Sequence, residues 1–205
     1  MSARLPAAVV LTGRLVALEP LDLARHVEGL AAVALDPNLW RWTQDRIADR
    51  ADPERYLTTA AAEAAVGRQL PFVIRWRATD HWIGMSRYLA IEPTHRRLEI
   101  GHSWVASPWQ RRGANLEAKL RLLRHAFDDL GYRRVEFKTH AANAAARAAL
   151  EGIGAVFEGI FRRHMAMPDG TVRDSAYYAI VDLDWPRVRA QLEARIARLG
   201  LGEPG

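Results

Sequence analysis

The stretch from Pro108 to Gly131 constrains the fold more than any other part of this 205-residue chain. From residue 116 onward, apolar side chains recur at intervals of four and three residues, the spacing of one face of an amphipathic helix. The apolar positions are Leu116, Leu120, Leu123, Phe127 and Leu130, and the polar positions are Glu117, Lys119, Arg121, Arg124 and Asp128. Gly131 stands where a left-handed residue commonly ends a helix. The sequence therefore predicts a helix with one face in the core and the other in solvent.

The residues before this helix have the order strand, short loop, helix. Residues 98–105 form an apolar run that predicts a strand, and the loop after it contains Gly113. Backbone N–H groups and the positive end of the helix dipole converge in such a loop, and Arg111 and Arg112 add full charges. This arrangement suits a pyrophosphate, although the Rossmann and Walker glycine patterns are absent. A loop with one glycine before a helix is also common without any ligand, so the loop alone does not decide the function.

Composition sets the outer limits. With 49% hydrophobic residues, the chain can bury one core, and we expect a single domain over residues 1–205 with residues 1–8 and 201–205 frayed. The lack of cysteine excludes disulfides, thiolate metal sites and a cysteine nucleophile, and no metal site is predicted. No apolar run approaches the roughly 20 residues that cross a bilayer. The N-terminus has too short an apolar core for a signal peptide, so we expect a cytoplasmic protein.

Net charge narrows the choice of ligand. The chain carries +5 at pH 7, which favours an anionic ligand such as coenzyme A, tRNA or an acidic substrate. The arginines are scattered, however, and do not form the clustered basic and aromatic face of a nucleic-acid module. Most of them are therefore interpreted as solvated surface, and we expect no binding to DNA.

Periodicity, caps and turn residues predict the order of the elements. The expected strands are residues 9–18 with an interruption at Gly13, 70–76, 81–91, 98–105, 135–139, 155–167 and 171–183. The expected helices are residues 20–33, 52–66 with Asp52 as cap, 116–130, a short one from Asn143 to Gly152, and a closing one after Asp184. This order predicts an α+β fold in which helices flank a mixed, mostly antiparallel sheet.

Several separated strings resemble the GNAT acyltransferase superfamily, and its RimJ/RimL-like branch in particular. Gln110-Arg-Arg-Gly-Ala-Asn115 resembles the Q/R-x-x-G-x-G/A loop that binds the coenzyme A pyrophosphate, with Asn115 in the place of Gly or Ala. The segment that begins at Leu11 resembles the start of the branch, and residues 134–155 are similar to its region after the principal helix. The resemblance covers nearly the whole chain and implies a GNAT fold with the pyrophosphate loop before the central helix.

The resemblance also implies a function. It predicts an acetyl-CoA-dependent N-acetyltransferase, in which a primary amine of a small molecule or of a protein or peptide N-terminus attacks the thioester directly. The residues expected to bind acetyl-CoA are Trp104, Val105, Gln110, Arg111, Arg112, Gly113, Ala114, Asn115 and Asn143. Asn143 matches an asparagine that helps to hold pantetheine in this branch, and it also suits a helix cap. A homodimer is compatible with the family, and no membrane partner is expected.

Two residues compete for the role of general base. Many GNAT enzymes carry a strand carboxylate that faces the cleft, and Glu99 lies close to that position; the alternative is a glutamate that only pairs with Arg87 or Arg97. His102 is the competing base. Strand alternation places His102 on the opposite face from Glu99, so only a bulge would bring both to the cleft.

The expected proton donor to the thiolate departs from the family pattern. RimL-type enzymes often carry a serine at the position of Ala146, so this hydroxyl is absent here. Tyr177 and Tyr178 are then the expected catalytic acids, and alternation allows at most one of them to reach the cleft. His140 or water would serve if neither does. Because of these departures, a non-catalytic acyl-CoA-binding protein or an RNA-binding protein on the same fold remains the alternative function.

Overall fold

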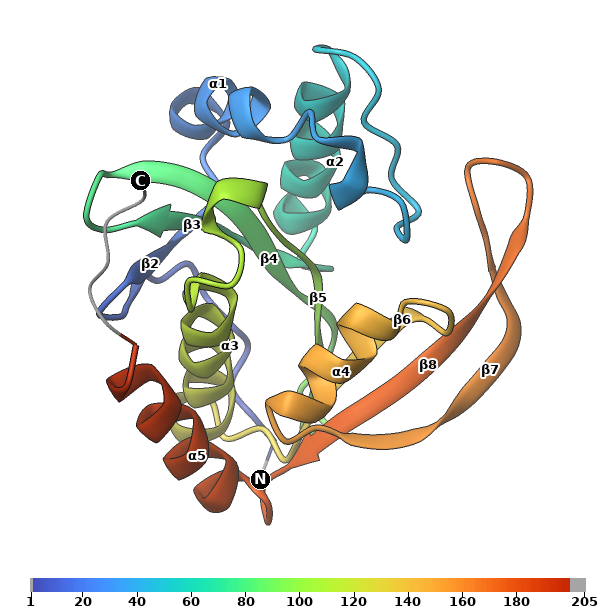
Figure 1. The fold of residues 1–205 in the computed structure, drawn as a ribbon. Coiled ribbons are helices and arrows are strands. Elements are labelled where there is room, and N and C mark those ends of the chain that lie inside the picture. The colour runs from blue at the N-terminus through green and yellow to red at the C-terminus, as the bar shows by residue number, and fades with distance from the viewer. Residues whose placement is uncertain (1, 200–205) are drawn as a thin grey trace.

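The computed structural model describes residues 2–199 and contains one eight-stranded sheet with helices on both faces (Figure 1). The strands are β1 (Leu11–Thr12), β2 (Val16–Pro20), β3 (Leu70–Trp76), β4 (His81–Glu92), β5 (Arg97–Val105), β6 (Arg134–His140), β7 (Val156–Ala166) and β8 (Val172–Val181). The helices are α1 (Leu23–Val33), α2 (Asp52–Ala65), α3 (Ala114–Arg124), α4 (Ala144–Gly152) and α5 (Trp185–Ala197). Short 3-10 turns lie at Pro37–Leu39 and Ser107–Trp109, and a π-helical turn at His125–Asp129.

The strand order is β1-β2-β3-β4-β5-β6-β8-β7, and β5 and β6 are the parallel pair in an otherwise antiparallel sheet. The closing hairpin therefore adds to the sheet through its second strand, since β8 lies between β6 and β7. This is the α+β fold with a mixed, mostly antiparallel sheet that the sequence predicts.

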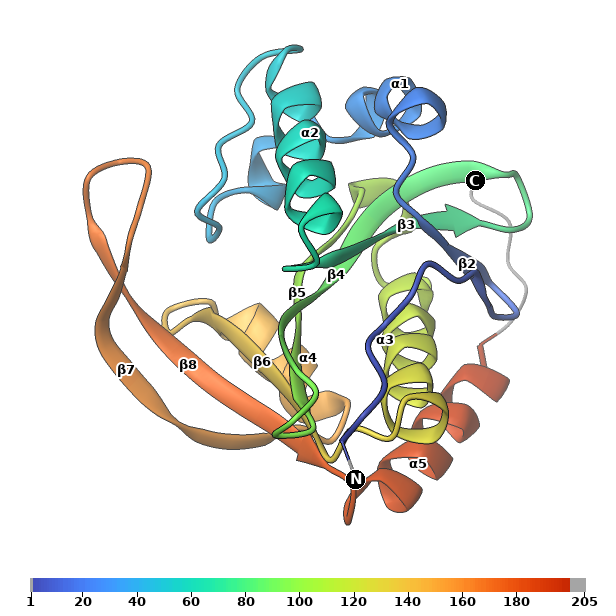
Figure 2. The ribbon, with the colours of Figure 1, turned by 180° about the vertical axis from the view of Figure 1, so that it is seen from behind.

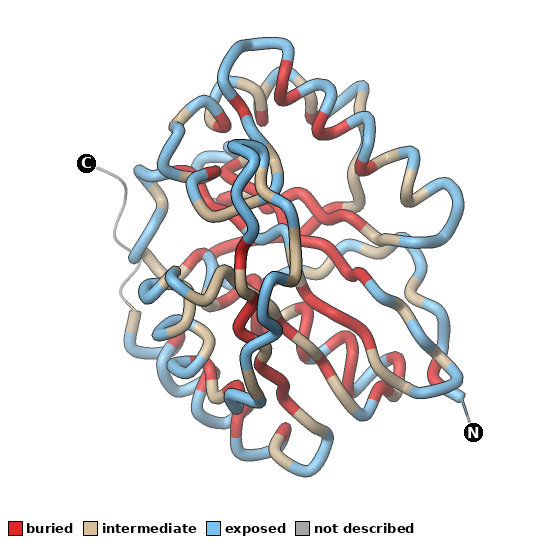
Figure 3. The backbone as a smooth tube through the Cα atoms, turned by 90° about the vertical axis from the view of Figure 1, so that its right-hand side faces the viewer, coloured by how far each residue is buried: buried red, intermediate tan, exposed pale blue. Residues whose placement is uncertain are grey.

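The sheet carries a separate hydrophobic core on each face, as strand alternation requires. Phe72 and Ile74 of β3 turn to the core that contains α3 and α5, whereas Val73 between them turns to the core beneath α1 and α2. Figures 1 and 2 show the two helix layers from opposite sides, and Figure 3 shows the buried strands between them. The functional elements are thus held on a sheet that is covered on both faces.

Helix α3 follows the prediction on its apolar face but not on its polar face. Gly131 has φ 75° and ends the helical segment after the π turn, as expected. Glu117 and Lys119, which the pattern assigns to solvent, are only 0% and 6% exposed. The prediction is wrong because α3 is enclosed on more than one side, by the sheet, by α5 and by the turn between β1 and β2.

Local structure corrects two further expectations. The N-terminal segment expected to fray is held by backbone bonds from Ala3 to the Pro93 carbonyl and from Arg4 to the Leu130 carbonyl, each 3.0 Å long. The predicted frayed residues 201–205 lie outside the described part of the chain. The α2 cap is Ala51, not Asp52, whose carboxylate accepts backbone N–H groups of the preceding loop. None of the helices described within residues 2–199 is long and apolar enough to cross a membrane.

Candidate active site

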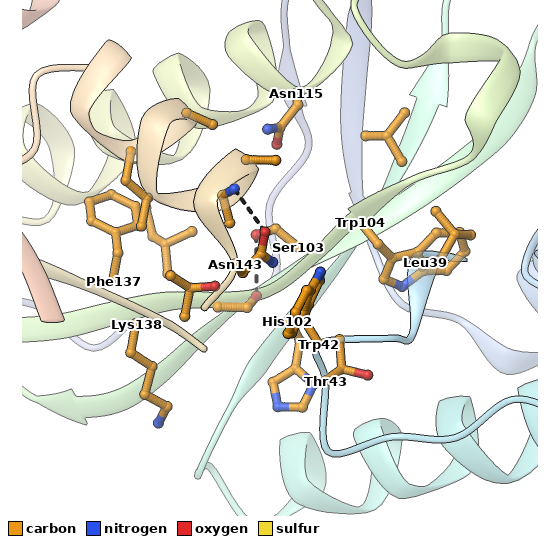
Figure 4. Close-up of a pocket in the computed structure, with 18 of the residues that line it drawn as sticks. Leu39, Trp42, Thr43, His102, Ser103, Trp104, Asn115, Phe137, Lys138 and Asn143 are labelled. Atoms are coloured by element: carbon orange, nitrogen blue, oxygen red, sulfur yellow. Dashed lines mark hydrogen bonds between the residues drawn. The ribbon is translucent and has the colours of Figure 1, made fainter. Parts of the chain in front are cut away.

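The site begins where two parallel strands separate. β5 and β6 pair only from Arg97 to Glu99, opposite Arg134 to Glu136, and then part. A cleft of about 640 Å³ opens there. Its walls come mainly from β5, β6, the first two turns of α3, α4 and the segment 38–45 that follows α1, with Tyr56 of α2 and Arg173 of β8 completing them (Figure 4). Beyond Glu99, the edge of β5 that faced β6 has no partner strand, so an extended ligand can pair there with the peptide groups other than the Val105 carbonyl, which the Gln110 side chain occupies.

The loop before α3 has the backbone that the sequence predicts for an anion site. Gly113 is the N-cap of α3 with φ 89°, and no side chain caps the helix, so its first N–H groups remain available. A Cβ at Gly113 would lie 2.3 Å from Leu199 Cδ1, so glycine is needed for space as well as for φ. The Gln110 side-chain amide donates to the Val105 carbonyl at 2.8 Å and ties the loop to β5.

Asn115, the departure from the family pattern, is accommodated without strain. It lies in the first turn of α3, and the left-handed residues of the loop are Arg111, with φ 60°, and Gly113. The side chain of Asn115 lies at the cleft (Figure 4), where a Gly or Ala would leave the wall bare. The substitution therefore changes the lining of the cleft and not the path of the backbone.

The structure brings most of the residues expected to bind acetyl-CoA to one cleft. Those that line it are Trp104, Val105, Gln110, Arg111, Asn115 and Asn143. Ala114 is instead buried, and it packs in the core at the start of α3. Asn143 also caps α4, because its Oδ1 accepts the Ala146 N–H at 3.0 Å (Figure 4). Both roles expected of Asn143 are thus compatible with its position.

A β-bulge brings both candidate bases to the cleft. His102 has φ 46°, and the register between β4 and β5 shifts because His102 and Ser103 together oppose only Ser86. His102 therefore turns to the same side as Glu99, and both residues line the cleft. Histidine is enriched in left-handed backbone relative to most non-glycine residues, but one histidine in an apolar run does not identify a bulge, so the sequence did not predict it.

His102 and Glu99 differ in their partners. His102 Nδ1 lies 3.2 Å from Asp45 Oδ2, on the segment between α1 and α2, and the imidazole is about one-third exposed. Glu99 is 5% exposed, and its Oε2 lies 3.0 Å from Lys138 Nζ on β6. The partner of Glu99 is therefore Lys138, whereas the sequence suggested Arg87 or Arg97. The ion pair holds the carboxylate at the base of the cleft.

The two tyrosines expected as acids lie elsewhere. Alternation places them on opposite faces of β8, as predicted, but neither is among the residues that line the cleft. Tyr178 is buried beneath α4, and its hydroxyl is 3.0 Å from both Arg147 Nε and Glu151 Oε1. Tyr177 stacks on Phe161 at 4.2 Å between ring centroids, and burial raises the pKa of its phenol. This geometry favours neither tyrosine as the acid, because neither lines the cleft even though β8 contributes Arg173 to its wall.

Both lysines of the chain line the cleft, which the sequence analysis did not recognise. Lys138 pairs with Glu99, and Lys119 Nζ donates to Ser103 Oγ at 2.5 Å from the opposite face of β5. The available signal was composition, since a chain that uses arginine almost everywhere retains lysine only at these two positions. Within residues 2–199, no three or more His, Asp or Glu side chains lie close enough together to hold a metal ion.

Comparison with known proteins agrees with this geometry. The Acetyltransferase (GNAT) domain matches residues 15–156. A GCN5-related N-acetyltransferase from Brucella melitensis is 31% identical, with a TM-score of 0.90 over 96% of this chain and 89% of that chain. RimJ of Mycobacterium smegmatis, solved in complex with CoA-disulfide, is 26% identical, with a TM-score of 0.75 over 92% of both chains.

A curated relative points to the same branch. YdaF of Bacillus subtilis (strain 168), whose name places it among ribosomal N-acetyltransferases, is 29% identical over 102 residues. The match covers 50% of this chain and 55% of YdaF, so it spans about half the length of each protein. These relatives confirm the predicted GNAT fold and the RimJ/RimL-like branch. They also confirm the predicted enzyme class, an acetyl-CoA-dependent N-acetyltransferase. The chain belongs to the GNAT acetyltransferase family.

Proposed function

We propose that this chain transfers an acetyl group from acetyl-CoA to a primary amine, and that the acceptor is the N-terminus of a protein or peptide. The observation that carries the proposal is the cleft at the parting of β5 and β6, which joins the Gly113 loop at one end to the His102–Asp45 pair at the other. The choice of acceptor is supported by the relatives, one of which is named as a ribosomal N-acetyltransferase.

The residues of the cleft fit acetyl-CoA. The uncapped N-terminus of α3 and the charge of Arg111 suit the pyrophosphate, and the open edge of β5 at Trp104 and Val105 suits the amides of pantetheine. Asn143 lines the cleft at the N-cap of α4. When bound, acetyl-CoA supplies the thioester carbonyl that an amine attacks. The chain must then accept a proton from that amine, which enters in its charged form at neutral pH.

We assign the general base to His102. Asp45 Oδ2 lies 3.2 Å from Nδ1, near enough to orient the imidazole once a hydrogen bond forms, and Nε2 is left for the incoming amine, as where a carboxylate orients a basic histidine. Glu99, paired with Lys138, is better placed to attract the ammonium form of the acceptor. Glu99 as base stays a prediction, and one pair of variants separates the two assignments. His102→Gln should lower kcat by on the order of 10²-fold with coenzyme A affinity intact, whereas Glu99→Gln should lower kcat by less than about tenfold. The reverse ranking would return the base to Glu99.

Thiol release tests the function directly. The chain has no cysteine, so every thiol that a thiol-reactive dye detects comes from coenzyme A. We expect release from acetyl-CoA in the presence of peptides with free N-termini, slower release with free amino acids, polyamines or amine-bearing antibiotics, and none with the same peptides acetylated at the N-terminus. If only small amines support release, the protein acceptor is wrong. If calorimetry shows acetyl-CoA binding and no acceptor gives release, the chain is the acyl-CoA binder of the alternative interpretation. Retention of RNA without binding of acetyl-CoA would favour the RNA-binding alternative.

A further inference from the structure

A buried lysine and a serine are hydrogen-bonded across β5 on the face of the sheet that α3 covers. Lys119 is 6% exposed, and its Nζ donates to Ser103 Oγ at 2.5 Å. Ser103 Oγ is also 2.7 Å from Ser86 Oγ on β4. Burying an ammonium group is costly unless an opposite charge pairs with it, and the described residues give Lys119 Nζ a hydrogen bond to Ser103 and the Phe137 ring at 5.5 Å, but no ion pair. This feature therefore needs an explanation beyond packing.

The pair stands at the part of the cleft where the reaction releases a thiolate. Pantetheine placed along Val105 and Trp104 continues toward His102, so its sulfur end passes Ser103, the exposed residue between them (Figure 4). On the α4 wall, the position that carries a serine in RimL-type enzymes is Ala146. The site thus lacks a hydroxyl on α4 and has one on β5, backed by an ammonium group.

Other hydroxyl groups along the cleft are less suited to this step. Thr43 Oγ1 is already engaged with two backbone carbonyls, those of Trp40 and Asp45. Tyr56 lies on the far face of the sheet, beside His102, and burial raises the pKa of its phenol to about 12. Thr139 on β6 also lines the cleft but contacts no ammonium in the described structure. Thr139 therefore provides the matched control.

We infer that Ser103 protonates the coenzyme A thiolate and that Lys119 supplies the proton to Ser103. This inference rests on the proposed acetyl transfer. As the C–S bond breaks, the sulfur keeps the electron pair and takes the proton from Ser103 Oγ. Ser103 Oγ takes a proton from Lys119 Nζ in the same step, and Lys119 is left as a neutral amine. Lys119 regains a proton from water after the product thiol leaves, while the amine proton leaves through the base on the other face.

The electrostatics of the site suit a proton donor. Burial lowers the pKa of Lys119 to about 7, against a partly opposing field from Glu99. The other charged side chains that line the cleft are Lys138 on β6, which pairs with Glu99, Arg111 in the loop before α3, Arg173 on β8, and Asp45 beside His102. An ammonium with this pKa donates readily to a thiolate, since ordinary thiols have pKa values near 8.5. Lys119 must be protonated to act, so kcat should fall as the pH rises above about 7.

Kinetics of matched variants test the relay. Ser103→Ala and Lys119→Met should each lower kcat by on the order of 10²-fold, and both should lose the alkaline fall in kcat. Thr139→Val should keep the wild-type profile. The double variant Ser103→Ala/Ala146→Ser should have a kcat at least about tenfold higher than that of Ser103→Ala, because Ala146→Ser places a hydroxyl on the opposite wall. Unchanged kcat in Ser103→Ala and Lys119→Met, or loss of the alkaline limb in Thr139→Val instead, would overturn the inference.

Two measurements without turnover distinguish this inference from the proposed function. The thiol of bound coenzyme A, titrated by its ultraviolet absorbance, should ionise at a lower pH in wild type than in Lys119→Met. In the ligand-free protein, the pKa of Lys119 is lower in the folded state than in the unfolded chain. Above about pH 7 the unfolded chain therefore binds more protons than the folded protein does. The free energy of unfolding of wild type should then rise with pH relative to that of Lys119→Met. Lys119 is refuted as the proton source if the thiol ionises at the same pH in wild type and Lys119→Met. It is also refuted if the difference in stability between the two proteins does not change with pH. If wild type never releases thiol, the proposed function fails, whatever these titrations show.

Discussion

Glu117 offers a sharp test of how the coenzyme A loop is supported. Its carboxylate is fully buried on α3 and accepts three backbone N–H groups from the turn between β1 and β2: Arg14 at 2.7 Å, Leu15 at 2.6 Å and Val16 at 2.9 Å. Gly13 makes this approach possible, since a Cβ there would lie 2.5 Å from the carboxyl carbon. The turn therefore fixes the first turn of α3, and with it the loop that precedes the helix.

The size of the effect follows from the geometry. Leaving a buried N–H group without a partner costs about 1–3 kcal/mol. Glu117→Ala leaves three such N–H groups without an acceptor, so it should lower the free energy of unfolding by about 3 kcal/mol or more. In Glu117→Gln the amide oxygen can take the place of Oε2 and keep the bonds from Leu15 and Val16. Only the bond from Arg14 is then lost, and the expected loss is about 2 kcal/mol.

Urea unfolding of the ligand-free protein measures both variants. Arg121→Gln is the comparison, because Arg121 Nη2 lies 3.6 Å from Glu117 Oε1, beyond hydrogen-bond distance, and its loss leaves all three backbone N–H groups with their acceptor, so it should cost less than Glu117→Ala. The reasoning is refuted if Glu117→Gln is as stable as wild type, or if Arg121→Gln costs as much as Glu117→Ala. In the second case the ion pair, and not the turn, would stabilise the helix.

Two further predictions concern the loop and the tyrosines. Gly113→Val should weaken acetyl-CoA binding beyond detection in calorimetry, because a branched residue at φ 89° costs about 1–3 kcal/mol and its Cβ collides with Leu199; equal affinity in the variant would misplace the site. Tyr177→Phe and Tyr178→Phe should both keep the wild-type kcat in the thiol-release assay, since neither side chain lines the cleft. Tyr178→Phe alone should lose about 1 kcal/mol of stability with its two hydrogen bonds, and a loss of turnover in either variant would restore a tyrosine as acid.

The order of the elements could be predicted from the sequence because each depends on local patterns. Period-two alternation marked β6, Asn143 marked the start of α4, and Gly131 marked the end of the principal helix. The loop residues from Gln110 to Asn115 could be placed for the same reason, since they are contiguous between a strand and a helix. Local sequence determines local backbone, and these parts of the site are local.

Burial of charge on α3 could not be predicted in the same way. An amphipathic pattern assigns a charged residue to solvent, yet Glu117 and Lys119 are enclosed because further elements pack on that side. What compensates each charge comes from distant parts of the chain, the turn at Arg14–Val16 for Glu117 and Ser103 on β5 for Lys119. The partner of each charge is distant in sequence, so the residues that flank Glu117 and Lys119 do not reveal it.

The bulge in β5 has the largest consequence that sequence patterns miss. Ile100 and Val105 belong to the core beneath α3, whereas Trp104 belongs to the core beneath α1 and α2. Simple alternation from Ile100 would put Trp104 on the α3 side and Ser103 on the other. The extra residue, His102, reverses the assignment of every position after it. As a result, His102 faces Asp45 while its neighbour Ser103 faces Lys119. One left-handed residue thus directs a candidate base and a candidate acid to opposite faces of one strand.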